Sequence, residues 1–600
     1  MTPSPWARFD DLQADTALLF PKALEVLVAK RPADVVAVLQ AVERVTDAGR
    51  WAYGFVSYEA AAALDPSLAV HQLQPDSPPL VWFGVTDAPE PVPPIGATAA
   101  DCSPPDLESW GAHWRPTWTQ DQHSRAVGRI LGRIARGDTY QCNLTVRMRG
   151  RVPDDPLELY RHMALAQRGA YNAYLDLGRF VIASASPELF IQRSGDELLL
   201  RPMKGTASRG RTLTEDRQQA LVLRTSAKER AENIMIVDLI RNDAARVSQV
   251  GGVRVRDLCE VERYETVLQL TSTVSAQLRP GVGLAELFRA LFPSGSVTGA
   301  PKVSTMALIR ELEPTPRGVY CGAIGFVAPP DAAVRARFNV AIRTAVLDRA
   351  LGSAEYGVGG GITWSSDPHA EHREVVTKTA VLHRRHREFE LIETMRFEPE
   401  LGLRNLARHL RRLSESAEYF GFRFEKASAV RELNAQLSDS GPTRVRLRLR
   451  RDGALAVDLS ALPAEGGPVV LAVDDHPVDS LSAWLYHKTS LREPYDTRRL
   501  RHSEADDVVL INERGELTET SRANLALRLD GQWWTPALSA GCLPGVERGR
   551  LLELRKITER VLTPADLGRA EEIAVLNSLR GWRSAVLTSP SIRFAIRRGS

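Results

Sequence analysis

The pattern of apolar and polar positions along the chain predicts a mixture of helices and strands. FVIASA at 180–185 is a short apolar run, typical of a buried strand. In 226–241 the apolar residues recur at helical spacing, which predicts an amphipathic helix. Ser226 and Glu229 have the spacing of a capping box, so we expect this helix to begin there.

A further helix start and a loop region complete the pattern of the first part of the chain. Asp367 followed by Pro368 is typical of a helix N-terminus, and the helical pattern continues towards Arg387. Segment 72–118 is rich in Pro, Asp and Ser, which predicts surface loops. Between about 120 and 385, helical periods alternate with short strands.

The pattern changes near residues 386–390, where a second unit is expected to begin. FELIETMRF (389–397) predicts a strand, NLARHLRRLSESAEYFG (405–421) predicts a helix, and strand patterns follow at 445–460. Six hundred residues are also too many for a single hydrophobic core. We therefore expect two domains, 1–385 and 389–600.

Composition and charge narrow the class of protein. Hydrophobic residues make up 44% and charged residues 25% of the chain, which is ordinary for a globular protein. A net charge of +3 gives no reason to expect a nucleic acid partner, and no apolar run is long enough to cross a membrane. The five cysteines are widely spaced and fit neither a zinc nor a disulfide pattern, which favours a reducing, cytoplasmic location. None of them is a plausible glutaminase nucleophile. They are Cys102, Cys142, Cys259, Cys321 and Cys542.

Carboxylates on two predicted helices are the first candidates for chemistry. Glu232 lies among apolar residues of 226–241, where an acid is paired, at the edge, or a ligand. Glu371, Glu374 and Lys378 are three and four residues apart and share one helix face. Spacing alone favours a surface ion-pair ladder for this trio. The alternative is a Mg²⁺ site that takes carboxylates from both helices.

Two Gly-rich segments accompany these helices. SGSVTGAPK (294–302) and GVGGGI (357–362) could expose backbone N–H groups to anionic oxygens, or could be tight turns. Neither has the spacing of a nucleotide-binding fingerprint in a strand–helix context.

Seven ordered motifs carry a resemblance to a known family. Together they resemble the chorismate-utilising enzymes, which include anthranilate synthase, isochorismate synthase and component I of aminodeoxychorismate synthase. The resemblance spans about 120–385, and WAYGFVSYEAAAALD (51–65) resembles the N-terminal part of the synthases. It implies an α+β fold for 1–385, a two-lobed sandwich of β-sheets flanked by helices. The motifs are GDTYQCNL (137–144), SASPELF (184–190), RPMKGTASRG (201–210), AENIMIVDLIRND (231–243), SGSVTGAPK (294–302), FNVAIRT (338–344) and GVGGGITWSSDPHAEHREVVTK (357–378).

The resemblance implies roles for the residues in these motifs. Glu232 and Glu374 would bind Mg²⁺ directly, and Glu371 would contact it through water or through the other ligands. The metal would bind the ring carboxylate of chorismate. Glu188 resembles the general acid that protonates the departing hydroxyl, a poor leaving group. The implied substrate contacts are Gln141, Thr206, Arg343, Gly359, Gly360, Gly361 and Lys378.

Three positions bear on which reaction the resemblance implies. Family members that add water carry lysine where this chain has Gln141, so Gln141 favours ammonia as the nucleophile. Lys204, in PMKGT, resembles members that aminate ring carbon 4, because its amine can first attack carbon 2. Gln269 stands where many synthases have histidine, which is compatible with a product that keeps its enolpyruvyl group.

The second domain carries a second resemblance. HKTSLREPYD (487–496), LTETSRANL (517–525) and GCLPGVERGRLL (541–552) are each weak signals that surface turns would also explain. In this order they resemble the class IV pyridoxal-phosphate enzymes, which include amino acid aminotransferases and aminodeoxychorismate lyase. The implied cofactor residues are Lys488 for the Schiff base, Glu519 for the pyridinium nitrogen, and Arg412, Gly545 and Val546 for the phosphate; Asn577 and Ser578 would form part of the wall.

The two resemblances together imply a bifunctional enzyme that makes 4-aminobenzoate. Chorismate and ammonia would be the substrates, Mg²⁺ and pyridoxal phosphate the cofactors, and a separate glutamine amidotransferase subunit the partner. The class IV domain should have a small α+β lobe at about 389–485 and a β-rich lobe at 486–600, and could form a homodimer. The alternatives are an anthranilate-type synthase fused to an aminotransferase, and a non-catalytic chorismate-binding scaffold.

Overall fold

The computed structural model describes residues 4–96, 114–382, 388–437, 440–464 and 466–588. The chain forms two compact units. The first comprises Met1–Ser208 and Ala220–Arg387, and the second comprises Arg209–Gln219 and Glu388–Ser600. None of the described helices combines the length and the apolar character that a bilayer crossing needs.

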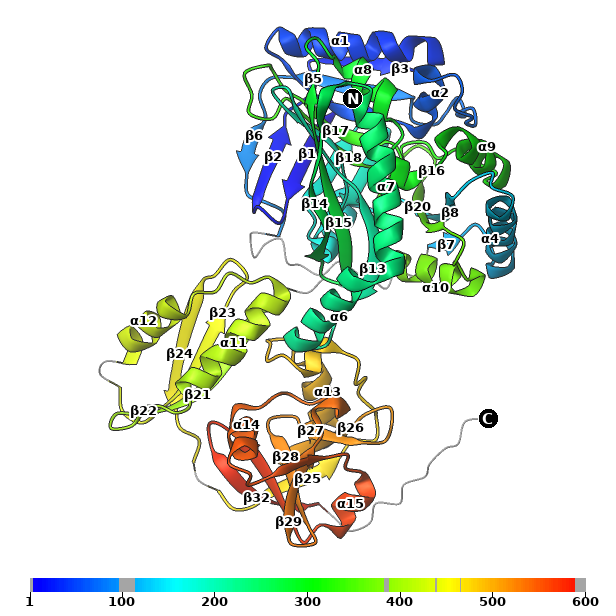
Figure 1. The fold of residues 1–600 in the computed structure, drawn as a ribbon. Helices are drawn as coiled ribbons and strands as arrows, with labels where there is room; N and C mark the ends of the chain where they lie inside the picture. The colour runs from blue at the N-terminus through cyan, green and yellow to red at the C-terminus, as the bar shows by residue number, and fades with distance from the viewer. Residues whose placement is uncertain (1–3, 97–113, 383–387, 438–439, 465, 589–600) are drawn as a thin grey trace. The chain divides into compact units, whose positions relative to one another are not determined.

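Two ten-stranded antiparallel sheets build the first unit (Figure 1). The first sheet runs in the order β16 (Gly299–Ala300), β8 (Gln141–Arg151), β20 (Ser353–Ile362), β19 (Thr344–Asp348), β10 (Phe180–Ser186), β9 (Tyr171–Asp176), β1 (Trp6–Asp11), β2 (Thr16–Phe20), β6 (Glu90–Val92), with β7 (Arg115–Pro116) beside β8. The second runs β13 (Met203–Ser208), β15 (Val267–Leu278), β12 (Glu197–Arg201), β11 (Leu189–Ser194), β18 (Ala336–Val340), β17 (Ala323–Val327), β4 (Trp51–Val56), β5 (Val81–Thr86), β3 (Glu25–Ala29), with β14 (Ser248–Arg263) beside β15.

Apolar side chains fill the space between the sheets and under the helices that cover them. Phe9 and Phe326 come from opposite sheets, and their rings meet edge to face at 5.5 Å. Helices α1, α7 and α8 cover the second sheet, α5 covers the first, and α4 and α9 cover β8. The helices are α1 (Val35–Asp47), α2 (Ala61–Leu64), α4 (Gln120–Ala135), α5 (Pro156–Gln167), α7 (Ala227–Ala245), α8 (Leu284–Leu291), α9 (Lys302–Leu312), α10 (Pro368–Thr379), and the 3-10 turns η1 (Pro32–Asp34), η2 (Tyr58–Ala60), η4 (Gly295–Val297) and η5 (Ala380–Leu382).

Local predictions for the first unit are mostly confirmed. The buried strand at 180–185 is β10, and the helix after Ser226 is α7, with the Ser226 hydroxyl accepting from the Glu229 N–H. The helix after Asp367 is α10, but it ends at Thr379 and not near Arg387. The prediction of surface loops throughout 72–118 is wrong, because the fully buried strand β5 lies inside it; residues 97–113 are outside the described part.

A buried ionic network ties loops of the first unit together. The guanidinium of Arg317 forms two hydrogen bonds with the Glu313 carboxylate, at 3.0 and 2.6 Å. It also donates to the carbonyls of Val297 and Asn143, at 2.7 and 2.8 Å. The Glu59 carboxylate accepts the N–H of Arg317 at 2.6 Å. Both charges of the Arg317–Glu313 pair are almost wholly excluded from solvent.

We expect Arg317→Ala to lower the free energy of unfolding of the first unit by about 3–5 kcal/mol, because it leaves buried Glu313 without a cation. Thermal and denaturant unfolding of the full chain, followed by circular dichroism, measures this loss. Arg129→Ala is the matched control, since Arg129 forms an exposed pair with Glu311; there we expect at most about 1 kcal/mol. Equal losses for both variants would contradict the structural role of the network.

The second unit contains a four-stranded sheet and an eight-stranded sheet. The small sheet runs β22 (Gly402–Leu403), β21 (Leu391–Glu398), β23 (Thr443–Leu449), β24 (Leu455–Ala461), and the large one β27 (Leu517–Thr520), β26 (Asp507–Ile511), β25 (Val469–Val473), β32 (Gly581–Leu587), β31 (Glu572–Asn577), β28 (Asn524–Leu529), β29 (Gln532–Pro536), β30 (Thr558–Arg560). The helices are α11 (Leu406–Phe420), α12 (Lys426–Leu437), α13 (Glu493–Arg501), α14 (Val546–Glu553), α15 (Pro564–Arg569), with η6 (Ala483–Leu485) and η7 (Leu538–Ala540).

The strand and helix predictions for 389–421 and 445–460 are confirmed by β21, α11, β23 and β24. Two boundaries differ from expectation. β25 belongs to the large sheet, so the small lobe ends before Val469 and not near residue 485. Residues 209–219 belong to the second unit, although a continuous first domain was expected. Their polar side chains find their partners in the second unit, as described below.

Candidate functional sites

The first unit contains a cavity of about 210 Å³ whose lining is mainly polar. Helix α7, which lies alongside β13 and β15, and helix α10 both contribute carboxylates to it (Figure 1). Strands β13 and β20 contribute Lys204 and three successive glycines. β20 pairs with β19 only as far as Tyr356, so the edge of Gly357–Ile362 is left without that neighbour and its backbone groups can meet a ligand.

Glu188 lines the cavity and is almost fully buried. Burial raises the pKa of its carboxyl to about 8, although the hydrogen bond from Ser296 acts in the opposite direction. The Ser296 hydroxyl donates to Glu188 Oε1 at 2.6 Å. At neutral pH the carboxyl is therefore protonated, which is the state that a general acid needs.

Lys204 and Gln141 converge at Gly361. A Cβ at Gly361 would lie 2.4 Å from Lys204 Nζ and 3.1 Å from Gln141 Nε2, so a side chain there would displace the lysine amine from its position. Gln141 is fully buried, and its amide nitrogen and oxygen have no hydrogen-bond partner among the described residues. Lys204 Nζ lies 3.5 Å from Glu232 Oε2. The amide can therefore bind a small polar molecule next to the amine.

Alternation along β8 explains why Gln141 points inward. Cys142 and Leu144 pack under α4 and α9 on the outer face. Gln141, Asn143 and Thr145 alternate with them and are buried on the other face. This polar set is a period-two signal that was visible in the sequence.

The predicted carboxylates lie on the wall of the cavity. Glu232, Glu371 and Glu374 all line it. Lys378 Nζ lies 2.7 Å from Glu374 Oε1 and donates to the Gly359 carbonyl at 2.8 Å. The charge of Lys378 lowers the pKa of Glu374, whereas burial, followed by the neighbouring Glu374 charge, raises the pKa of Glu371. Of the surface ion-pair ladder expected from spacing alone, the Glu374–Lys378 pair is present, and both of its residues line the cavity.

The cavity-lining residues that the sequence analysis missed include the charged residues Lys228 and Glu229. Glu229 was read as a capping-box residue, yet only its backbone N–H meets Ser226, and its carboxylate lines the cavity. Burial and the charge of Glu232 raise its pKa. The signal was the three-residue spacing of Glu229 and Glu232, which repeats that of the other pair on α10.

These four carboxylates have the oxygen-donor chemistry that a divalent cation needs, although no three of them have oxygen atoms that all lie within 4.8 Å of one another. Mg²⁺ prefers oxygen ligands from few side chains and keeps several waters. Neighbouring carboxylates contribute to the raised pKa of Glu229 and Glu371, and a cation would relieve that repulsion. Lys204 and Lys378 partly neutralise the other two carboxylates.

Arg343 and Thr206 line the remaining walls. Arg343 adopts a left-handed backbone conformation, φ 52°, and its side chain donates to Gln167. Thr206 Oγ1 donates to Gln269 Oε1 at 3.2 Å, and Gln269 itself lines the cavity. All the predicted substrate contacts except Gln141 are thus cavity-lining residues, and Gln141 lies beside Gly361.

In the second unit, Lys488 follows η6 and is half-buried. Burial, assisted by the charge of Arg412, lowers its pKa to about 8. Burial raises the pKa of Glu519 on β27 to about 7. The Tyr495 hydroxyl donates to Glu519 Oε1 at 3.0 Å, and Asn524 Nδ2 donates to Oε2 at 3.3 Å. Tyr495 and Asn524 were not predicted.

Arg412 extends from α11 into a buried network. It donates to both carboxylate oxygens of Glu393, at 2.9 and 2.6 Å, and to the Pro544 carbonyl at 3.3 Å. His409 bridges Glu393 at 2.6 Å and the Ser578 hydroxyl at 2.8 Å. Burial acts to raise the pKa of Glu393, but Arg412 and His409 hold it at about 2. Glu393 and His409 thus fix the orientation of Arg412.

Gly545 precedes the first turn of α14, whose N–H groups lack acceptors within the helix. A Cβ at Gly545 would lie 1.8 Å from Asn524 Oδ1, so glycine is required. A poorly solvated lysine, a buried acid, an oriented arginine and a helix N-terminus form the donor set that a pyridine ring with a phosphate needs. These residues therefore fit pyridoxal phosphate.

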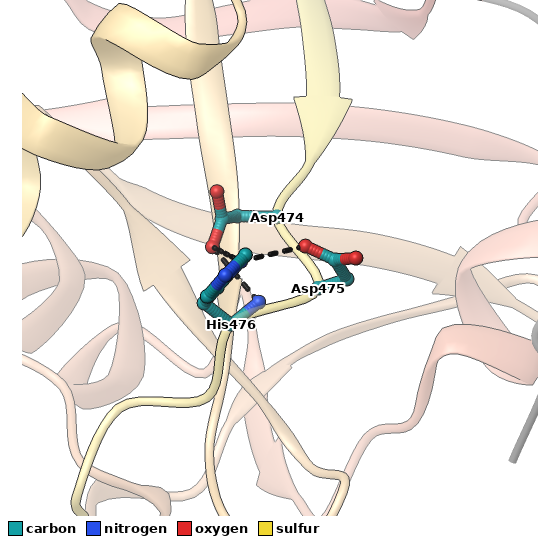
Figure 2. Close-up of side chains that lie close together, drawn as sticks. All are labelled: Asp474, Asp475 and His476. Carbon is teal, nitrogen blue, oxygen red and sulfur yellow. Dashed lines mark hydrogen bonds and ion pairs between the residues drawn. The ribbon is translucent and has the colours of Figure 1, made fainter. Parts of the chain in front are cut away.

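A third cluster, Asp474, Asp475 and His476, has metal-like spacing but different chemistry (Figure 2). Its three ligand atoms lie within 4.8 Å of one another, the one such group of three found among the described residues. Asp474 is fully buried, and Arg501 lies 2.7 Å from it and His502 3.2 Å. Because cations already neutralise Asp474, the cluster is a structural ion-pair network and not a metal site.

Comparisons with known proteins agree with the two family resemblances of the sequence. Residues 11–384 match the chorismate binding enzyme family, and residues 390–587 match the class IV amino-transferase family. The chain therefore belongs to the chorismate binding enzymes and carries a class IV aminotransferase fold after the chorismate-binding fold.

Individual relatives include two kinds of synthase. The chain is 39% identical over 267 residues to aminodeoxychorismate synthase component 1 of Bacillus subtilis, covering 44% of this chain and 56% of that protein. It is 40% identical over 297 residues to anthranilate synthase component 1 of Streptomyces coelicolor, covering 49% and 57%. The match thus spans little more than half the length of these relatives. The solved structure of anthranilate synthase component I from Streptococcus pneumoniae has the same fold, with a TM-score of 0.53, 24% identity and coverage of 62% and 92%.

Proposed function

We propose that this protein makes 4-aminobenzoate and pyruvate from chorismate and ammonia, in two steps at two sites. The observation that carries the proposal is the convergence of Lys204, Gln141 and Gly361 in a cavity that also holds the buried carboxyl of Glu188, whose pKa burial raises. A lysine amine next to an acid supports addition to the ring with loss of water. Relatives of both ortho- and para-aminating types are similar to this chain, so the proposal depends on the residues of the site.

The first step uses Lys204 as a nucleophile. Its amine forms a bond to ring carbon 2 while the bond from carbon 4 to its hydroxyl breaks. Glu188 gives its proton to that hydroxyl, which leaves as water. Ammonia, held by the Gln141 amide, then bonds to carbon 4, and the double bond shifts back as Lys204 leaves carbon 2. Glu229, Glu232, Glu371 and Glu374 would hold Mg²⁺, which supplies positive charge to the substrate carboxylate.

The second step removes the enolpyruvyl group of the aminated product. Pyridoxal phosphate, when bound, supplies an electron sink next to the substrate amine. Lys488 takes the proton from carbon 4, a transfer that suits its pKa of about 8. The bond from ring carbon 3 to the ether oxygen then breaks, the enolpyruvyl group takes up a proton and leaves as pyruvate, and the ring becomes aromatic. Glu519, held by Tyr495 and Asn524, binds the pyridine nitrogen, and Arg412 lies beside the loop to α14 that would hold the phosphate.

Product identity tests the proposal. The purified chain, supplied with chorismate, Mg²⁺, pyridoxal phosphate and an ammonium salt, should form 4-aminobenzoate, as measured by chromatography against both isomers. With glutamine in place of ammonium we expect little product, because we propose that a separate glutamine amidotransferase supplies the ammonia. Formation of 2-aminobenzoate would show an anthranilate-type synthase, and absence of any product would favour a non-catalytic scaffold.

The pKa of Glu188 predicts the pH dependence of the first step. The pKa of its carboxyl is raised to about 8. The proton donor is therefore present below pH 8 and is lost as the pH rises through that value. At constant free ammonia, kcat/KM should therefore fall above pH 8. Glu188→Gln should lower the rate by about 10²- to 10⁴-fold and remove this alkaline limb. If Glu188→Gln keeps the alkaline limb, another group titrates. Ser296→Ala is a milder change for comparison, because it removes only the hydrogen bond to Glu188.

A further inference from the structure

Residues 209–219 have an unexpected place in the molecule. They lie inside the segment that matches the chorismate binding enzyme family, but they belong to the second unit. The chain joins the second unit at Arg209, immediately after β13, and leaves it after Gln219, part-way along helix α6 (Leu213–Thr225). A short peptide of the chorismate-binding region is therefore part of the second unit, which carries the class IV fold.

The peptide begins with a rigid turn. Arg209 donates to both oxygens of the buried Asp216 carboxylate, at 2.7 and 3.0 Å. The Gly210 N–H donates to the same carboxylate at 3.1 Å. A Cβ at Gly210 would lie 2.2 Å from the Asp216 backbone nitrogen, so only glycine fits. Charge-assisted bonds and this close approach hold the turn in one conformation.

The turn binds helix α11 through Tyr419. The Tyr419 hydroxyl donates to the Gly210 carbonyl at 2.7 Å, and Arg209 donates to the Tyr419 carbonyl at 2.7 Å. The Arg209 guanidinium also lies over the Tyr419 ring, 4.4 Å from its centre. Arg211 contacts Tyr486 in the same two ways, through a hydrogen bond to the hydroxyl at 2.9 Å and by lying over the ring. Tyr486 is two residues before Lys488 in the sequence, and Tyr419 lies on α11.

His487, the residue directly before Lys488, is held by the same peptide. His487 Nε2 lies 3.2 Å from the Arg211 carbonyl, and because a carbonyl can only accept, Nε2 carries the proton. Burial lowers the pKa of His487 to about 4, so the ring is neutral and Nδ1 accepts from the Ser416 hydroxyl at 2.8 Å. The ring also stacks on Tyr419 at 4.4 Å. These contacts fix both the position and the tautomer of the His487 ring.

We propose that residues 209–219 are a positioning element for Lys488. The Arg211 carbonyl fixes the ring of His487, and the fixed ring holds the backbone from which the Lys488 amine projects. The inference rests on the proposed function, in which Lys488 holds pyridoxal phosphate. It makes the cofactor affinity of the class IV unit depend on a peptide that lies, in sequence, within the chorismate-binding region.

The test uses two variants of the full chain, Gly210→Ala and Tyr419→Phe. Gly210→Ala displaces the turn, and Tyr419→Phe removes one hydrogen bond to it but keeps the ring. The loss of one hydrogen bond should raise the Kd for pyridoxal phosphate by about 2- to 10-fold, with Gly210→Ala at least as strong. The pH at which the absorbance band of the lysine-bound cofactor changes should also shift, a readout that a purely structural role would leave unchanged.

Matched controls separate this effect from general destabilisation. Gly128→Ala places a methyl group on α4 with nothing within 4 Å, and Arg217→Ala removes an exposed ion pair with Glu418 from the same peptide. Both should keep the wild-type Kd and band. If Gly210→Ala does not fold, Tyr419→Phe decides the matter. Wild-type Kd and band pH in the folded test variants would overturn the positioning role, whereas a wild-type chain without a lysine-bound band would overturn the proposed function of Lys488 itself.

Discussion

Replacing Lys204 by alanine is expected to lower the rate of 4-aminobenzoate formation by roughly 10³-fold or more, because the nucleophile of the first step is lost. Any residual product should shift towards the ortho-aminated isomer, with or without its enolpyruvyl group, since ammonia can then attack ring carbon 2 directly. Chromatography of reactions with chorismate and an ammonium salt measures both the rate and the isomer ratio.

The matched control for this variant is Lys228→Ala. Lys228 lines the same cavity and carries the same charge, but it lies on α7 and not beside Gln141 and Gly361. It should keep the para product. Without ammonia, wild-type chain incubated with chorismate should gain the mass of chorismate minus water on Lys204, and Lys204→Ala should not. Undiminished 4-aminobenzoate output from Lys204→Ala would end the nucleophilic assignment.

Lys488→Ala should separate the two steps. The amination of chorismate should continue while 4-aminobenzoate formation falls by roughly 10³-fold or more, because the group that binds the cofactor and moves the carbon-4 proton is gone. The aminated intermediate should accumulate, and the visible absorbance of the lysine-bound cofactor should disappear. Mass spectrometry of the products and absorbance of the dialysed protein measure these changes.

Lys426→Ala is the control, since Lys426 is an exposed lysine at the start of α12. It should leave both the product and the absorbance unchanged. Normal 4-aminobenzoate output from Lys488→Ala would assign the second step to another group. Loss of amination together with elimination would instead show that the two sites do not work independently.

The side-chain chemistry of the main sites was already encoded locally. The resemblance of ordered motifs to two enzyme families predicted Lys204, Glu188, Arg343, the helix carboxylates and Lys488, whereas spacing alone favoured a surface ion-pair ladder for the carboxylates of 367–387. A short apolar run also predicted β10, and helical periodicity predicted α7, since both patterns reflect which side chains are buried. A prediction failed where solvent exposure was inferred from composition: β5 is a buried strand within a Pro-rich segment that was expected to form surface loops.

The sequence by itself determined which residues could act and on which local elements they lie. Only the tertiary structure decided that Glu229 faces the cavity, that Gly361 leaves room for Lys204 and Gln141, and that Glu188 is protonated at neutral pH. It also decided that residues 209–219 belong to the class IV unit. The reason is physical: distances between remote segments and the loss of solvent around a charge arise when separate elements pack together, and neither is written in a local pattern.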